Sequence, residues 1–384
     1  MKKIYFDGSA TTAVFPEAVQ AMVQCMNSDF GNPSSSHSFG RKAKKLIENA
    51  RCQVAGLINA KPDEIFFTSG GTEADNLAIL GVASRYEKGH IITTSIEHHA
   101  VLKCCEYLET KGFDVTYLKV DTEGSIDLSE LRESIRSDTI LISVMHGNNE
   151  VGTIQPIELI GKIAQDNGII FHVDAVQSLG KIEVDVSKIN CDLLTCSSHK
   201  INGPKGVGAL YIKYNTPISG IILGGGQENN IRSGTENVPG IVGFGKAAEI
   251  TAEKWRINAQ HTKKLRDYFI NRLENEFDNV KINGSQSYRL PHNINFSFND
   301  TDGVSLMLLL DNDGIAVSTG SACNSSNVNA SHVLTAIGLP DDWLRCSIRV
   351  TLGYNNTKDE IDYLIDRLKI NRKLLIEAER LFNN

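Results

Sequence analysis

The sequence predicts an α/β protein with a mainly parallel seven-stranded sheet and a second, smaller α+β domain. Between about residues 64 and 213, seven short β-rich runs alternate with helical stretches, and the pattern changes after about residue 250. Short apolar runs separated by helices are typical of buried parallel strands joined by crossovers. The length of 384 residues suits two domains better than one simple core.

The expected strands of the large sheet read, in order, EIFFTSG, HIITTS, DVTYLKV, TILISVM, IIFHVDA, LLTCSSHK and GALYIK. A first helix is expected at Pro16, where proline suits the opening turn of a helix. The residues from Pro156 to Asn167 form another helical pattern, and Gly168 is expected to stop it.

After residue 250, a long helical pattern leads to new strands with the sequences VKING, NINFSF, GIAVST and SIRVTLG. A final helix is expected near Thr357, where TKDE matches the capping-box pattern. We therefore predict a large domain over residues 15–255 and a small domain made of residues 1–14 and 256–384.

Composition excludes several classes of protein. The formal net charge of −7 argues against a protein that coats nucleic acid. The N-terminus lacks the apolar region of a signal peptide, and no apolar run approaches the roughly 20 residues of a membrane helix. A cytoplasmic location is therefore expected.

The eight cysteines contain no C-x-x-C and no zinc-finger spacing with histidine, so neither a disulfide framework nor a metal site is predicted. Most of the eight are expected to be small buried apolar residues.

Polar motifs follow several of the expected strands, where ligands bind in open α/β sheets. Gly71 and Thr72 come after EIFF, at the start of a helix, where backbone N–H groups bind phosphate. An ordinary strand-to-helix turn is the alternative. Asp174 ends an apolar strand, where a carboxylate is costly unless it is paired. It either pairs with a cofactor cation or caps the next helix.

A lysine follows the next strand in the motif Ser197-Ser198-His199-Lys200. Lys200 lies 200 − 174 = 26 residues after Asp174, so the two are expected at neighbouring strand ends. A lysine among small residues forms a Schiff base if its surroundings lower its pKa. The alternative is a solvated loop lysine, which most lysines are.

Two further residues complete the motifs. Cys323 lies in a Ser/Gly/Asn-rich sequence and is the cysteine expected to be an accessible nucleophile, although an incidental exposed cysteine is the alternative. Arg349, on the expected strand SIRVTLG, suits a two-pronged pair with a substrate carboxylate. A surface arginine on an edge strand is the alternative.

Together these motifs closely resemble the cysteine desulfurases, which belong to the class V branch of the aspartate-aminotransferase fold (fold type I). The resemblance runs from YFDGSATT to SIRVTLG and covers nearly the whole chain. It is greatest to the group whose catalytic loop reads S-x-G-S-A-C, the type associated with iron–sulfur cluster assembly. The resemblance implies pyridoxal 5′-phosphate (PLP) as cofactor and L-cysteine as substrate.

The resemblance also implies roles for individual residues around the cofactor. Lys200 resembles the lysine that holds PLP, Asp174 the partner of the pyridine nitrogen, and Gln177 the donor to the ring hydroxyl oxygen. His98 is similar to the histidine that stacks on the ring and acts in acid–base steps. The implied phosphate contacts are Gly71, Thr72, Ser197, His199 and, from the partner subunit of a homodimer, Thr235.

For the substrate, Asn32, Asn149 and Arg349 resemble contacts to its carboxylate and to cofactor oxygens, and Cys323 matches the sulfur acceptor. The implied reaction converts L-cysteine to L-alanine and leaves a persulfide on Cys323. A protein acceptor would then receive the sulfur, either an iron–sulfur scaffold or a carrier for tRNA or cofactor thiolation. No direct nucleic-acid contact and no membrane contact are expected.

Three other functions fit the same fold, two of them enzymatic. A selenocysteine lyase or a class V aminotransferase would use the same cofactor, and a transaminase would not need Cys323. A non-catalytic scaffold is the least favoured alternative. A binding module has no reason to keep a buried carboxylate, Asp174, beside a Schiff-base lysine, Lys200.

Overall fold

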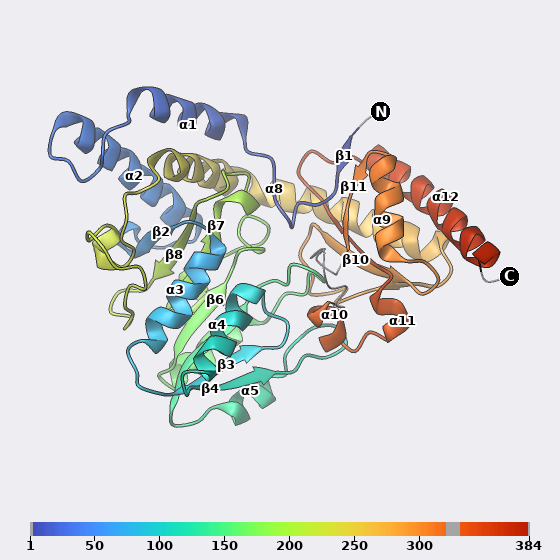
Figure 1. The fold of residues 1–384 in the computed structure, drawn as a ribbon, viewed down its shortest axis with the longest axis horizontal. Helices are drawn as coiled ribbons and strands as arrows, with labels where there is room; N and C mark the ends of the chain where they lie inside the picture. Colours follow the sequence, from blue (N-terminus) through green and yellow to red (C-terminus); the bar gives the residue numbers. More distant parts are fainter. Residues whose placement is uncertain (1–2, 320–330, 383–384) are drawn as a thin grey trace.

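The computed structural model describes residues 3–319 and 331–382. A large α/β part and a smaller part lie side by side, and one long helix, α8 (Val238–Glu276), runs through both (Figure 1). With 39 residues, α8 is about 58 Å long, which explains how one element reaches two separate cores.

The large part contains one seven-stranded sheet, as predicted, and the seven expected runs are its strands. Only β8 runs antiparallel to its neighbours, so the sheet is mainly parallel. In spatial order the strands are β2 (Ile65–Thr68), β8 (Gly208–Ile212), β7 (Leu193–Ser197), β6 (Ile170–Asp174), β5 (Thr139–Met145), β3 (His90–Thr94) and β4 (Asp114–Leu118).

Helices cover both faces of this sheet (Figure 1). They are α1 (Pro16–Ser28), α2 (Ser38–Leu57), α3 (Gly71–Ala83), α4 (His99–Glu109), α5 (Leu128–Ser134), α6 (Ile157–Asp166) and α7 (Val186–Ile189), with the short turns η1 (Pro62–Glu64), η2 (Ser198–Lys200) and η3 (Glu228–Asn230). The start of α1 at Pro16 and the position of α6 agree with the sequence prediction.

The side chains of successive strand residues point to opposite faces of the sheet, and both faces are covered by helices. Residues on both faces are therefore apolar, which explains the unbroken apolar runs in the sequence. Leu194 of β7 packs in one core with α2, α6 and the first half of α8. Its neighbour Leu193 packs in a second core with α3 and α4. The ends of the strands are therefore held between two rigid layers.

The smaller part has a four-stranded antiparallel sheet in the order β12 (Ser318–Thr319), β13 (Ser347–Thr351), β10 (Asn293–Phe298) and β9 (Val280–Ile282). The N-terminal strand β1 (Ile4–Tyr5) pairs with β11 (Ile315–Ala316), so the start of the chain joins this part as expected. Its helices are α9 (Gly303–Asn312), α10 (His332–Ala336), α11 (Asp341–Leu344) and α12 (Lys358–Phe382).

The expected capping box opens α12. The Thr357 hydroxyl accepts a hydrogen bond from the Glu360 backbone N–H, and the Glu360 carboxylate accepts one from the Thr357 N–H. The proposed domain boundary at residue 255 falls within α8, and the division into two domains stays a prediction.

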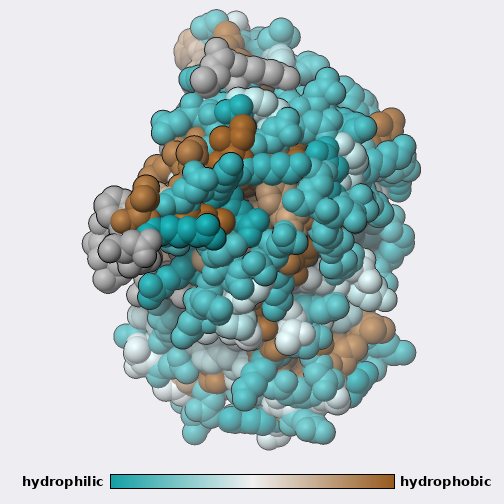
Figure 2. Space-filling view, turned by 90° about the vertical axis from the view of Figure 1, so that its right-hand side faces the viewer, coloured by the Kyte–Doolittle hydropathy of each residue, from teal (hydrophilic) through white to brown (hydrophobic). Residues whose placement is uncertain are grey.

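On the side where α12 lies, the surface is mostly hydrophilic, with apolar side chains in small groups (Figure 2). Among the helices in the described ranges, none combines the length and apolarity needed to cross a membrane. Of the seven cysteines in these ranges, six are buried and Cys52 is exposed, which agrees with the expectation that most are core residues.

Candidate active site

A cavity of about 350 Å³ opens at the carboxyl ends of β6 and β7, where ligands bind in open α/β sheets. It brings together most of the residues that sequence reasoning singled out. The lining residues are Ser9, Ala10, Gly71, Thr72, Asp75, His98, Met145, Asn149, Asp174, Val176, Gln177, Ser197, His199, Lys200 and Arg349.

Lys200 reaches the cavity from η2, the turn that follows β7. Its ammonium donates hydrogen bonds to the carbonyl oxygens of Ser9 and Ala10, at 2.5 and 2.8 Å. Burial lowers the pKa of Lys200 to about 8, with a further contribution from the positive charge of Arg349. Lys200 is therefore a nucleophilic amine under mildly alkaline conditions.

Asp174 is the last residue of β6 and is only 6% exposed. One carboxylate oxygen, Oδ1, accepts a hydrogen bond from the Val176 backbone N–H at 2.9 Å. Burial raises the pKa of Asp174, because the charged form is poorly solvated there. A cationic group in the cavity would stabilise the ionised carboxylate, and this is what a protonated pyridine nitrogen supplies.

The start of α3 borders the cavity and has features that suit an anion. Gly71 opens this 13-residue helix, and a Cβ at Gly71 would lie only 3.0 Å from the Val176 side chain. The Ser197 hydroxyl is buried beside it and has no hydrogen-bond partner among the described residues. A helix N-terminus with the hydroxyls of Thr72 and Ser197 fits a phosphate group.

Two histidines border this cavity. His98 is the N-cap of α4, and its Nδ1 accepts a hydrogen bond from the Ala100 N–H at 3.1 Å, which leaves Nε2 for a ligand. Burial lowers the pKa of His98. His199 shares a hydrogen bond of 3.1 Å between its Nδ1 and the Thr11 hydroxyl, and burial lowers its pKa to about 4. Both rings are therefore neutral near pH 7.

Strand β13 of the small part supplies Arg349 to the same cavity. Its guanidinium forms an ion pair with Asp7 at 2.9 Å and donates to the Asn149 carbonyl oxygen at 3.2 Å. The Nε of Arg349 is buried without a partner among the described residues. A carboxylate ligand would satisfy this remaining donor.

Three of the predicted site residues are not brought to this cavity by the described chain. The Asn32 side chain accepts a hydrogen bond from the Ser34 N–H within its own loop. Thr235 lines another cavity, together with Thr68 and Arg232. Cys323 lies outside the described residues. The roles of these three residues, like those of the residues that line the cavity, stay predictions.

Sequence reasoning assigned no role to four polar contributors to the site. The carbonyls of Ser9 and Ala10 hold Lys200, and Asp7 holds Arg349. Asp75 is fully buried on α3, near His172 of β6 at 3.6 Å, and burial and the charge of Asp174 raise its pKa. In the sequence, Asp75 could have been noticed as an aspartate within an otherwise apolar helix pattern. The backbone carbonyls of Ser9 and Ala10 leave no signal in the sequence, because every residue has one.

Comparison with known proteins gives the family. The model of class V aminotransferases matches residues 4–364. The chain belongs to this family. It is 51% identical, over 96% of this chain and 94% of the relative, to cysteine desulfurase IscS of Dictyoglomus turgidum.

Solved structures agree with this membership. A NifS-like protein matches with a TM-score of 0.91 and 41% identity over 97% of this chain and 99% of that one. SspA, solved in complex with cysteine, matches with a TM-score of 0.82 and 40% identity over 93% of this chain and 100% of that one. The architecture is therefore fold type I, as predicted.

The members of this family depend on PLP, and the cavity has a matching feature for each end of that cofactor. Lys200 is an amine with a lowered pKa, and Asp174 is a buried carboxylate at a neighbouring strand end. The unpartnered Ser197 hydroxyl lies beside the start of α3. These residues fit PLP.

Proposed function

We propose that this protein is a PLP-dependent cysteine desulfurase that transfers the sulfur of L-cysteine to Cys323 and releases L-alanine. The observation that carries the proposal is the Lys200–Asp174 pair beside an anion site, in a chain with 51% identity to a cysteine desulfurase. The relative solved in complex with cysteine supports the choice of substrate.

Bound PLP supplies an electron sink for charge that develops on the substrate Cα. Asp174 is suited to hold the pyridine nitrogen in its protonated form, and Gly71, Thr72 and Ser197 to bind the phosphate. Lys200 holds the cofactor between turnovers. Once the amine is free, either Lys200 or His98 moves the substrate's α-proton, since both border the same cavity.

Arg349 is placed to bind the substrate carboxylate, with its buried Nε as an available donor. The Cys323 thiolate then attacks the substrate sulfur. The new S–S bond forms as the substrate Cβ–S bond breaks, and the electron pair stays with the substrate carbon. Protonation of that carbon gives alanine, and Cys323 carries the persulfide.

A protein acceptor then takes this sulfur for iron–sulfur cluster assembly or for thiolation of tRNA or cofactors. The IscS name of the similar proteins supports the first use. We further propose a homodimer in the cytoplasm, in which Thr235 of each subunit contacts the phosphate bound by the other. This arrangement is supported by the position of Thr235 outside the Lys200 cavity of its own chain.

The test is to incubate the purified holoenzyme with L-cysteine and a thiol reductant and to quantify alanine and sulfide together. Equal amounts over many turnovers are expected. Cys323→Ala is expected to abolish turnover while the cofactor absorbance stays. Cys52→Ala is the matched control, because Cys52 is exposed on α2 and lies outside the cavity.

Steady sulfide release by Cys323→Ala would refute the role of this cysteine. A keto acid in place of alanine would identify an aminotransferase. Alanine formed from selenocysteine alone would identify a selenocysteine lyase. Lys200→Ala is expected to lose covalently held PLP, whereas Lys213→Ala, at a lysine that pairs with Asp192, is expected to keep it.

A further inference from the structure

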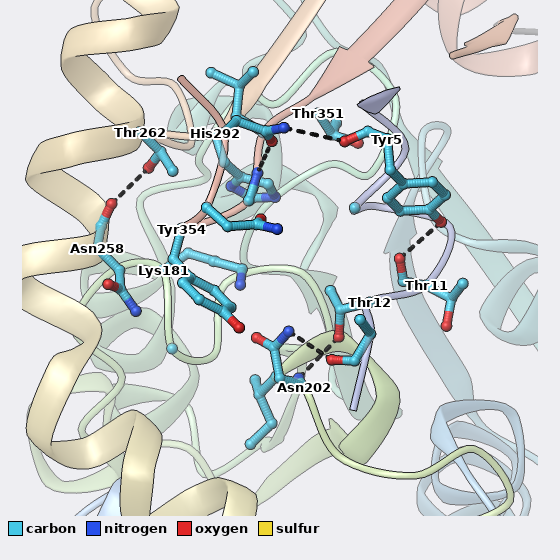
Figure 3. Close-up of a pocket in the computed structure, with 18 of the residues that line it drawn as sticks. Tyr5, Thr11, Thr12, Lys181, Asn202, Asn258, Thr262, His292, Thr351 and Tyr354 are labelled. Atoms are coloured by element: carbon cyan, nitrogen blue, oxygen red, sulfur yellow. Dashed lines mark hydrogen bonds between the residues drawn. The ribbon is translucent and has the colours of Figure 1, made fainter. Parts of the chain in front are cut away.

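A second cavity, of about 420 Å³, lies between the N-terminal segment, helix α8 and the loop that follows β13. It is larger than the Lys200 cavity, and neither the sequence motifs nor the proposed reaction uses it. Lys181, Tyr354 and Asn202 turn their polar ends into the space (Figure 3).

Two stretches of chain, residues 8–12 and 199–202, form part of the wall between the two cavities. Ser9 and Ala10 line the Lys200 cavity, whereas Thr11 and Thr12 line the second one. The Thr12 hydroxyl donates to the His199 carbonyl oxygen at 2.8 Å, directly before Lys200. The second cavity is therefore a separate compartment behind the candidate active site.

Lys181 brings an unpaired positive charge to this cavity. It follows Gly180, which has a φ of +70° and whose added Cβ would lie 2.5 Å from the Thr251 methyl group, so the turn requires glycine. Within residues 3–319 and 331–382, the Lys181 ammonium has no hydrogen-bond or ion-pair partner. Burial lowers the pKa of Lys181 to about 8, so most of the side chain is still charged at pH 7.

His292 adds an unpartnered polar group in the same cavity. Its side chain is 1% exposed, and its Nδ1 has no hydrogen-bond partner among the described residues. Burial, followed by the charge of Lys181, holds the pKa of His292 well below its usual range. The ring is therefore neutral, with one N–H. Buried polar groups without partners are rare in native proteins and indicate a missing ligand, ion or water.

The other charges of the lining also favour an anion. Lys3 and Lys205 add two positive groups. Among the described lining residues, Glu360 is the acidic one. Its carboxylate already accepts hydrogen bonds from the Asn356 side-chain amide and the Thr357 backbone N–H. The formal net charge of the chain is −7. The local excess of positive charge in this cavity is therefore opposite in sign to the overall charge of the protein.

We propose that the second cavity binds a small molecule through an oxyanion, either a carboxylate or a phosphate group. The Lys181 ammonium and the His292 ring N–H donate hydrogen bonds to its oxygens. This site is distinct from the one that holds the substrate and PLP, and the proposal does not depend on sulfur transfer.

The test is calorimetric titration of the PLP-loaded holoenzyme with inorganic phosphate and, separately, with succinate, against chloride at matched ionic strength. In the holoenzyme, bound PLP already fills the phosphate site at Thr72. Saturable binding of one anion per subunit is expected, and which probe binds tells a phosphate ligand from a carboxylate ligand. Lys181→Met is expected to weaken binding about tenfold or more, since it removes a charged hydrogen bond.

Lys213→Met is the matched control, because Lys213 pairs with Asp192 and lines a different pocket. This variant is expected to bind the anion as tightly as the unsubstituted protein does. His292→Leu is expected to weaken binding as well, so the proposal stays testable if one variant does not fold. No saturable binding of either anion to the unsubstituted holoenzyme would overturn it. Binding that a folded Lys181→Met or His292→Leu variant keeps at full strength would also do so.

Discussion

At the scale of single residues, the environment of Lys200 decides what a common side chain can do. Two backbone carbonyls fix its ammonium, and burial with the nearby Arg349 charge lowers its pKa to about 8. An exposed lysine, with an ordinary pKa near 10.4, would be almost wholly protonated at that pH. The motif Ser-His-Lys shows which lysine to examine, but burial makes it reactive.

The pH dependence of cofactor capture follows from this shift. Covalent capture of PLP by the apoenzyme requires the neutral amine, so its rate should rise with pH, reach half its maximum near pH 8 and level off above. Stopped-flow absorbance of apoenzyme mixed with PLP measures this. Arg349→Met removes a positive charge that lowers the pKa of Lys200. The capture rate of this variant is therefore expected to reach half its maximum at a higher pH. A rate in the unsubstituted protein that is still rising at pH 10 would contradict the prediction.

At the scale of elements, one buried ion pair joins three segments around the large sheet. Arg51 of α2 forms a two-pronged pair with Glu228 of η3, with distances of 2.8 and 2.7 Å. Glu228 also accepts a hydrogen bond from the Phe67 N–H of β2 at 2.8 Å. Both side chains are buried, so the loss of either partner leaves an uncompensated charge.

Glu228→Gln is therefore expected to lower the free energy of unfolding by about 3–5 kcal/mol, as measured by urea denaturation. The matched control is Glu106→Gln, which breaks the exposed pair between Lys103 and Glu106 on α4 and should cost less than about 1 kcal/mol. Equal effects of the two changes would show that the burial of Glu228 contributes nothing.

At the scale of the whole molecule, the candidate site is assembled from both parts of the chain. The Asp7–Arg349 pair joins the N-terminal segment to β13. Ser9 and Ala10 of that segment and Arg349 of β13 line the cavity at the end of the large sheet. Thr235 is absent from that cavity in its own chain and lines a separate one. The proposed homodimer gives this residue a phosphate to contact.

Mixed dimers test that arrangement. A Lys200→Ala subunit paired with a Thr235→Ala subunit contains one site with both an intact Lys200 and an intact Thr235 from the partner. Mixing the two inactive or weakened variants under subunit exchange should therefore restore alanine formation at one site of each mixed dimer. No recovery, with mixed dimers verified by differential tagging, would show that Thr235 serves its own chain.

The sequence alone was sufficient to predict the mainly parallel seven-stranded sheet, the start of α1 and the capping box of α12. These depend on local signals, namely apolar runs, a helix-starting proline and the Thr357–Glu360 spacing. The family was also evident from motifs at strand ends. Polar groups such as Asp174 and Lys200 are costly there without a function, which makes them conspicuous in the sequence.

Only the tertiary structure decided how these groups are partnered. The contacts of Lys200 with Ser9 and Ala10, and of Arg349 with Asp7, join residues 190 or more positions apart. The cationic cavity of Lys181 and His292 likewise has no motif of its own. The physical reason is that hydrogen-bond partners and desolvation depend on which segments pack together, whereas helix and strand patterns depend on residues close in sequence.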